Sequence, residues 1–198
     1  ILPQQQTIRA LLDHGAMALI SRDVELPTAL ASLSKAPRLV ITDSQAFSQV
    51  SQLVPPEVPL TSFSILFARY KGDLAETVRG AAALRQIDDD DTILIAEGCT
   101  HHRQCDDIGT VKIPNLVRRF TGRNPKFVFT SGGEFPQDLT PFSLIIHCSG
   151  CMLNEKEVKY RFRCAKEQGV AITNYGIAIA FMHGILDRSL EPFGGLGA

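Results

Sequence analysis

Two short stretches rich in metal-binding side chains each follow an apolar run, and this repeated arrangement restricts the possible folds more than any other feature. Cys99-Thr100-His101 comes shortly after the run Thr92–Ala96, and His147-Cys148-Ser149-Gly150-Cys151 comes directly after Phe142–Ile146. Each run has the length and apolar character of a buried β-strand. The carboxyl ends of parallel strands lie at one edge of a sheet, so residues distant in sequence meet there. We therefore expect the two stretches to converge on one metal site.

Apolar runs alternate with helical patterns along the whole chain, and this alternation predicts an α/β fold with parallel strands. The strands expected in the first part are short: Met17–Ile20, Arg38–Thr42 and a brief one near Leu60. Those expected in the second part are more clearly apolar: Thr92–Ala96, Lys126–Thr130, Ser143–Ile146 and Val170–Thr173.

Helices are expected between these strands, several of them after a residue suited to capping a helix N-terminus. The expected ranges are Gln4–His14, Leu26–Leu33, Ser44–Leu53, Thr61 or Ser62 to Phe67, Leu74–Ile87, Thr110–Phe120, Asn154–Gln168 and Tyr175–Leu186. Asp43, Asp73 and Asn154 are the expected caps.

The acidic run Asp88–Asp91 marks a boundary between two small domains, each a mostly parallel β-sheet flanked by helices. The first domain covers residues 1–90 and the second covers residues 91–198. Three short strands make too small a sheet to bury itself well, and the outer strand exposes an unpaired edge. We therefore expect a homodimer formed through the first domain.

Composition excludes several classes of protein. The 198 residues carry a net charge of −1 without a basic stripe, so we expect no nucleic-acid partner and no membrane-surface partner. The longest apolar region, Val170–Leu186, is interrupted by polar residues and is too broken to span a bilayer. The odd count of five cysteines in a chain of this size argues against a secreted disulfide scaffold and favours a cytoplasmic protein with reduced thiols. The chain has no P-loop motif, and because it starts at Ile1 we expect an upstream part.

The ligand spacing is C-x-H, then 45 residues, then H-C-x-x-C, and it leaves three interpretations open. In the first, Cys99, Cys148 and Cys151 hold an iron–sulfur cluster whose remaining iron has a different ligand. In the second, three cysteines and one histidine hold a structural zinc ion in a protein-interaction module. In the third, Cys148 and Cys151 form the redox pair of a thiol oxidoreductase.

The stretches Glu97–His102, Cys105–Gly109 and His147–Met152 resemble HydF, the maturation factor of iron-only (FeFe) hydrogenases. The resemblance covers essentially the whole chain. It implies that residues 1–90 are a dimerisation domain and residues 91–198 a cluster-binding domain, while the GTPase domain of the family is absent from this sequence. It also implies a 4Fe-4S cluster on Cys99, Cys148 and Cys151.

The role implied by the resemblance is that of a scaffold or carrier. Such a protein receives a di-iron precursor from radical-SAM maturases and delivers it to apo-(FeFe)-hydrogenase. This chain by itself would then not be an enzyme, whereas the full-length parent would be a GTPase.

A carrier has to release its cargo, and a cluster held by three thiolates leaves one iron for a replaceable ligand. His101 and His147 are the first candidates for that position, followed by Glu97 and Glu134. The alternative for His101 is a hydrogen bond to a cluster sulfur, and the alternative for His147 is a role in orienting a ligand.

Two further cysteines are expected to play no part in metal binding. Cys164 falls in the middle of a predicted helix and is expected to be a small core residue. Cys105 lies in the loop after Cys99, close enough in sequence to approach the site, but we expect it not to bind the metal.

Overall fold

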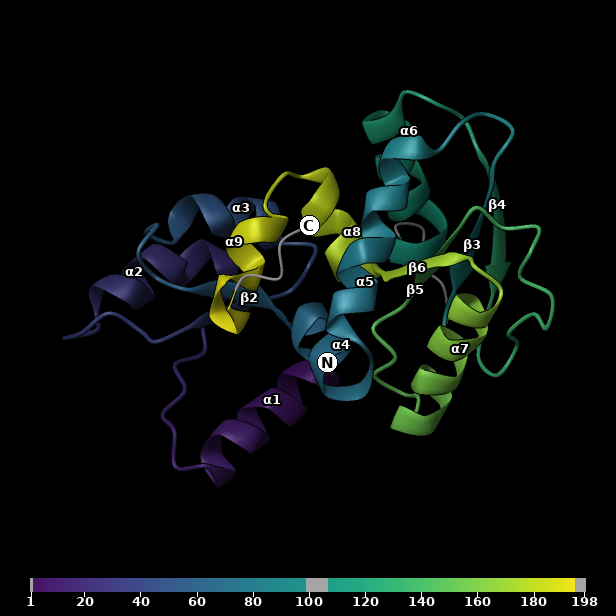
Figure 1. Cartoon of the computed structure of the whole chain (residues 1–198). Coiled ribbons are helices and arrows are strands. Elements are labelled where there is room, and N and C mark those ends of the chain that lie inside the picture. Colours follow the sequence, from purple (N-terminus) through teal and green to yellow (C-terminus); the bar gives the residue numbers. More distant parts are fainter. Residues whose placement is uncertain (1, 99–106, 195–198) are drawn as a thin grey trace.

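The computed structural model describes residues 2–98 and 107–194, in which two parallel β-sheets are flanked by helices (Figure 1). The smaller sheet pairs β1 (Val40–Thr42) with β2 (Leu60–Ser62). The larger sheet contains β3 (Thr92–Ala96), β4 (Lys126–Thr130), β5 (Leu144–His147) and β6 (Ala171–Asn174). All strand pairs are parallel, so the expected α/β fold with two mostly parallel sheets is confirmed.

The helices lie close to the ranges expected from the sequence. They are α1 (Leu2–Asp13), α2 (Leu26–Ala31), α3 (Phe47–Leu53), α4 (Phe63–Lys71), α5 (Leu74–Ala81), α6 (Ile113–Thr121), α7 (Glu155–Glu167), α8 (Tyr175–Met182) and α9 (Leu186–Leu190). Short 3₁₀ turns span Asp23–Glu25, Ala82–Gln86 and Glu191–Phe193, and a π-helical turn, Ile108–Lys112, precedes α6. The expected caps Asp73 and Asn154 accept hydrogen bonds from the N–H groups of Glu76 and Glu157. The expected cap Asp43 is wrong, because α3 begins at Phe47 and Ala46 occupies its N-cap position.

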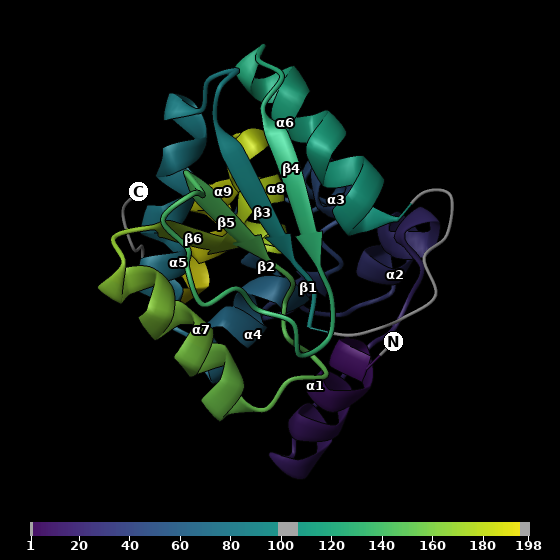
Figure 2. The ribbon, with the colours of Figure 1, turned by 90° about the vertical axis from the view of Figure 1, so that its right-hand side faces the viewer.

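The larger sheet has the strand order β4-β3-β5-β6, which Figure 2 shows side by side. Alternate side chains of its two central strands, β3 and β5, pack on opposite faces. Ile93 and Ile146 lie in a core shared with α5, α6 and α8, whereas Leu94 and Ile145 lie in a second core shared with α7. Burial on both faces explains why these strands are continuous apolar runs in the sequence.

The strand expected over Met17–Ile20 is wrong. These residues follow α1 without regular structure, and Met17 is fully exposed. Leu19 and Ile20 expose 58% and 68% of their surface. A short apolar segment forms a strand only if a neighbouring strand pairs with it, and in the described chain β1 pairs only with β2.

The chain returns at its C-terminal end to the smaller sheet. Helix α9 packs on β2, where the Thr61 hydroxyl donates to the carbonyl oxygen of Ser189 (3.0 Å). Arg188 donates to the carbonyl oxygens of Ser51 (2.5 Å) and Val54 (2.7 Å). One hydrophobic core therefore runs from α3 through α4 and α8 to the larger sheet. No helix in the described ranges has both the length and the apolar character needed to cross a bilayer.

Candidate metal centre

The ends of all four strands of the larger sheet lie at one edge. Ala96 pairs with Thr130 on one side and with His147 on the other, and His147 pairs with Asn174. The chain passes from β3 to β4 on one side of β3 and then returns to β5 on the other side of β3. The strand order therefore changes direction between β3 and β5. Such a switch point opens a crevice at the carboxyl ends of the strands, where α/β proteins bind ligands. Strands β3 and β5, which precede the two ligand-rich stretches in the sequence, both end at this switch point.

The sulfur of Cys148 lies directly against the end of β3. The N–H of Cys148 donates to the carbonyl oxygen of Ala96 (2.9 Å), which extends the pairing of β5 with β3 by one residue. The N–H groups of Gly98 and Gly150 lie 3.0 and 3.4 Å from Cys148 Sγ. Backbone N–H donors stabilise negative charge on a sulfur, and the thiolate is the form that binds metals.

Glycine is required at two positions around this sulfur. We call residues 148–154, between β5 and α7, the cysteine loop. A Cβ atom on Gly98 would lie 2.6 Å from two carbon atoms of the Leu153 side chain, so the end of β3 and the cysteine loop pack closely. Gly150 has a φ of +65°, in the left-handed region that favours glycine, and an added Cβ would lie 3.0 Å from Val158. The spacing of the C-S-G-C motif thus reflects a tight turn between β5 and α7.

His147 is buried, and both of its ring nitrogens have partners within the protein. Nδ1 lies 2.5 Å from the carbonyl oxygen of Cys148, and Nε2 lies 3.2 Å from Arg161 Nη1. Because a carbonyl accepts and a guanidinium donates, these partners assign the proton to Nδ1. Burial, with a smaller contribution from the positive charge of Arg161, lowers the pKa of His147 to about 4, so the ring is neutral at pH 7.

Arg161 links the ends of β4 and β5. Its side chain has no exposed surface, and besides His147 it donates to the carbonyl oxygen of Gly132 (2.8 Å) and to Glu157 (2.8 Å). The guanidinium also stacks over the ring of Phe135, 5.0 Å from its centroid. Our reading of the sequence missed this residue.

Glu97 is buried at the end of β3, 2% exposed, beside the start of α8. The Tyr175 hydroxyl donates to Glu97 Oε1 (3.3 Å). Burial is the main cause that raises the pKa of Tyr175, and the negative charge of Glu97 is the second. A Cβ on Gly109 would lie 2.4 Å from Glu97 Oε1 and 2.4 Å from the Tyr175 hydroxyl oxygen, so the backbone at Gly109 passes close to these two side chains. Asp107 is also buried and accepts hydrogen bonds from the N–H (2.8 Å) and hydroxyl (2.9 Å) of Thr110.

The other expected ligands occupy different environments. Cys151 is a half-buried free thiol in the same loop as Cys148. Glu134 is exposed in the turn after β4, where its N–H donates to the carbonyl oxygen of Ser131 (3.2 Å). Cys99 and His101 lie outside the described residues, as does Cys105. Within residues 2–98 and 107–194, no group of three or more His, Cys, Asp or Glu side chains is arranged to hold a metal ion.

Cys164 lies far along α7 and is half-buried. It packs against the core between α7 and the sheet, next to residues such as Phe162 and Ala165. Cys164 is thus a partly buried residue at the margin of this core and not one of its fully buried members.

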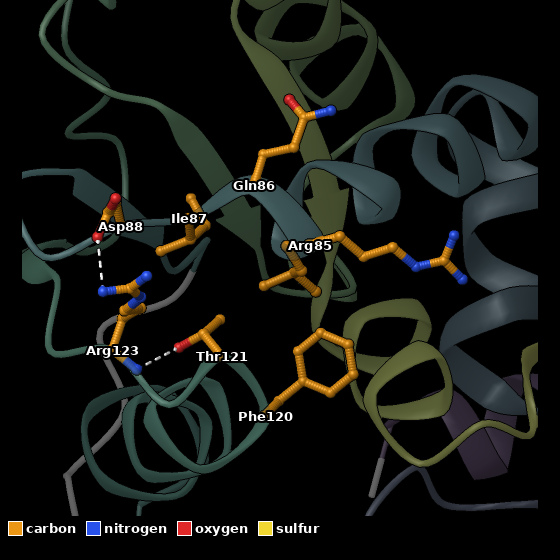
Figure 3. A pocket seen from close by; sticks show the side chains of 8 residues that line it. Arg85, Gln86, Ile87, Asp88, Phe120, Thr121 and Arg123 are labelled. Atoms are coloured by element: carbon orange, nitrogen blue, oxygen red, sulfur yellow. Dashed lines mark hydrogen bonds and ion pairs between the residues drawn. The ribbon is translucent and has the colours of Figure 1, made fainter.

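A pocket of about 460 Å³ lies at the other edge of the sheet, between the residues that precede β3 and the end of α6 (Figure 3). It is lined by residues 84–88 and by Phe120, Thr121 and Arg123. Arg123 forms ion pairs with Asp88 (3.4 Å) and Asp89 (3.5 Å), and all three side chains are at least half exposed. Because it lies at the amino ends of the strands, this pocket is separate from the cysteine loop.

Two family models together match almost the whole chain. The model of the hydrogen maturase F dimerization domain matches residues 1–72, and the model of the hydrogen maturase F tetramerization domain matches residues 75–192. A search among curated proteins found no match. The two models meet between α4 and α5, so that β1 and β2 fall in the first and the four-stranded sheet falls in the second.

Proposed function

The chain belongs to the hydrogen maturase F (HydF) family, and from this membership we propose that it carries an iron–sulfur cluster during hydrogenase maturation. The matched domains are named for assembly and not for catalysis. A role in hydrogenase maturation follows from the family. The cluster, its cargo and its partners are proposals.

We propose that Cys99, Cys148 and Cys151 hold a 4Fe-4S cluster at the switch point between β3 and β5. The observation that carries this proposal is the contact between the Gly98 N–H and Cys148 Sγ (3.0 Å). Gly98 directly precedes Cys99 in the sequence, so the last described residue before Cys99 contacts the sulfur of Cys148. Thiolates are the usual ligands of iron–sulfur clusters, and N–H donors to a ligating sulfur raise the reduction potential of the cluster.

The fourth iron would bind a weaker, replaceable ligand, for which the candidates remain His101, His147, Glu97 and Glu134. The engagement of both ring nitrogens favours His147 as the residue that orients the Cys148 backbone. Glu97 is buried at the same strand end as Gly98, whereas Glu134 is exposed after β4. These environments support Glu97 over Glu134 among the carboxylates.

The proposed task of the cluster is to hold a di-iron precursor received from radical-SAM maturases and to pass it to apo-(FeFe)-hydrogenase. A three-thiolate site would suit this task, because Cys99, Cys148 and Cys151 would keep the cluster in place while the replaceable ligand of the fourth iron would leave a position for cargo. The parent protein would add a GTPase domain, and the reduced thiols suit a cytoplasmic location.

We expect protein purified without oxygen to be brown and to contain about four iron and four sulfide ions per chain, as a 4Fe-4S site requires. Iron and acid-labile sulfide assays on the same sample provide the measurement. A colourless protein with one zinc ion per chain would contradict the proposal and favour a structural zinc site. A metal-free protein with a reversible disulfide between Cys148 and Cys151 would favour a thiol oxidoreductase.

The chain is expected to form a homodimer through the domain that residues 1–72 match. The sheet of β1 and β2 leaves one edge of each strand unpaired within the described chain, and two strands rarely suffice alone. Large apolar side chains are also exposed from the last turn of α1 to the segment before α2, namely Leu12, Met17, Leu19, Ile20 and Val24. Light scattering at micromolar concentration should give a mass of two or four times 21.7 kDa, and a monomer would contradict the expectation.

A further inference from the structure

Lys71, the last residue of α4, contacts the cysteine loop with its whole ammonium group. Its Nζ atom donates to the carbonyl oxygens of Gly150 (3.2 Å), Cys151 (3.1 Å) and Leu153 (2.9 Å). An ammonium group has three N–H donors, so all of them are used by this one loop. The side chain is half-buried, and Nζ lies 5.3 Å from the centre of the Phe67 ring.

The loop needs such a partner because it belongs to neither a strand nor a helix. It leaves β5 after His147 and enters α7 at Glu155, and it turns sharply at Gly150. Carbonyl oxygens outside a strand or helix lack the regular backbone ladder of partners, and a buried one left unpaired costs free energy. The Gly150 carbonyl oxygen also accepts the Leu153 N–H (3.1 Å), and Lys71 adds a donor to it. Lys71 thus donates to three carbonyl oxygens of the loop from a single point.

A second contact ties the same loop to α4. The hydroxyls of Ser64 and Ser149 lie 2.7 Å apart, and Ser44 donates to Ser64 (2.9 Å). Asn174, at the end of β6, donates to the carbonyl oxygen of Ser64 (3.1 Å). The loop is therefore held between the sheet edge on one side and α4 on the other.

We propose that Lys71 is a positioning residue of the metal site, which holds the backbone on both sides of Cys151 in the shape that the cluster needs. Lys71 lies in the segment that matches the dimerization domain, whereas Cys148 and Cys151 lie in the segment that matches the tetramerization domain. The geometry of the cysteine loop thus depends on a residue of the other domain, and α4 couples the two. We call the three hydrogen bonds from Lys71 to this loop the Lys71 clamp. The clamp is inferred from these contacts alone, and only its effect on the cluster rests on the proposed function.

The test compares hydrogen exchange of the loop amides in metal-free protein. Lys71→Met keeps the apolar stem but removes every donor, so we expect exchange in a peptide covering residues 149–153 to be at least tenfold faster. The Leu153 amide should respond most, because it donates to the carbonyl oxygen of Gly150 (3.1 Å), one of the three that Lys71 binds. The amides of β3 and β5 should change less than twofold, which separates a loosened loop from global unfolding.

The matched control is Lys159→Met on the exposed side of α7. Lys159 forms one i,i+4 ion pair with Glu155 and is 60% exposed, so the loop amides should exchange as in the parent. Equal loop exchange in Lys71→Met and Lys159→Met would overturn the proposal.

Lys71→Arg keeps the positive charge but changes the geometry of the donors, and it replaces Lys71→Met as the test variant if that variant does not fold. The donors of a planar guanidinium lie on three separate nitrogen atoms, whereas Lys71 reaches its three carbonyl oxygens from the single Nζ atom. The larger head group does not fit this arrangement, so we expect loop exchange in the arginine variant to be faster than in the parent. Parent-like protection in Lys71→Arg would mean that charge alone suffices, and the clamp would be wrong.

A second readout uses protein loaded with iron and sulfide without oxygen. We expect Lys71→Met to retain less than half of the parent's iron and to change the electron paramagnetic resonance spectrum of the reduced cluster, while Lys159→Met changes neither. An unchanged spectrum and iron content beside faster loop exchange would overturn the positioning role. A parent that binds no cluster would instead contradict the proposed function and leave the exchange result to judge the clamp.

Discussion

Gly80→Ala is expected to destabilise the protein by about 3 kcal/mol, although alanine is the better helix former. Gly80 lies in α5 where this helix crosses β6. An added Cβ would lie 1.9 Å from the carbonyl oxygen of Ile172 and 2.5 Å from its carbonyl carbon. Both atoms belong to the backbone of a buried strand and cannot rotate away, so either the helix or the strand has to move. Overpacking of this kind costs about 1–3 kcal/mol and sometimes more.

The two effects of this substitution have opposite signs, and their sizes decide the outcome. Replacing glycine by alanine inside a helix stabilises it by about 1 kcal/mol. A contact of 1.9 Å is far shorter than any carbon–oxygen van der Waals distance, and relieving it separates α5 from the sheet that it covers. The steric cost should therefore exceed the gain in helix propensity.

Urea unfolding of the metal-free protein, followed by circular dichroism, measures this effect. The control is Gly133→Ala, because an added Cβ there has no atom within 4 Å and the backbone φ is not positive. We expect the control to lie within about 0.5 kcal/mol of the parent. If Gly80→Ala unfolded at the same urea concentration as Gly133→Ala, the close packing of α5 on β6 would be wrong.

The larger sheet was predictable mainly because β3, β5 and β6 are buried apolar runs, whereas the edge strand β4 is largely exposed. The expected bounds of β3 and β4 match the structure, and those of β5 and β6 differ by one residue at each end. In such strands the sequence is apolar throughout and polar at once beyond the ends. Met17–Ile20 has the same local pattern but lacks a neighbouring strand, and local sequence carries no information about that neighbour.

The meeting of the carboxyl ends of β3 and β5 was predictable, but the contacts that hold the loop after β5 were not. Neighbouring parallel strands end at the same edge of a sheet, and β5 pairs with β3, so the carboxyl ends of these two strands lie next to each other. Lys71 was missed because it acts on residues about eighty positions later in the chain. Arg161 had a visible signal, since it shares the buried face of α7 with Val158, Phe162 and Ala165 at helical spacing. A charged residue on an apolar helix face indicates a buried partner, which here is His147.

Cys148→Ser is expected to abolish cluster binding while the fold remains intact. The Cys148 sulfur accepts hydrogen bonds from two backbone N–H groups at the switch point, and it is one of only three proposed thiolate ligands. A serine oxygen is a hard ligand with a shorter bond to iron, and a hydroxyl does not ionise at neutral pH. Because even changes in the surroundings of a ligand reduce metal affinity 10–100-fold, loss of a ligand should leave less than about a tenth of the parent's iron.

Iron and sulfide assays after reconstitution without oxygen measure the loss, and urea unfolding checks the fold. Cys164→Ser is the matched control, since Cys164 is also half-buried but lies among the core residues of α7. It should keep the full iron and sulfide content, and both variants should stay within about 1 kcal/mol of the parent's free energy of unfolding when metal-free. If Cys148→Ser bound as much iron and sulfide as Cys164→Ser, a cluster held by the sulfur at the β3–β5 switch point would be excluded.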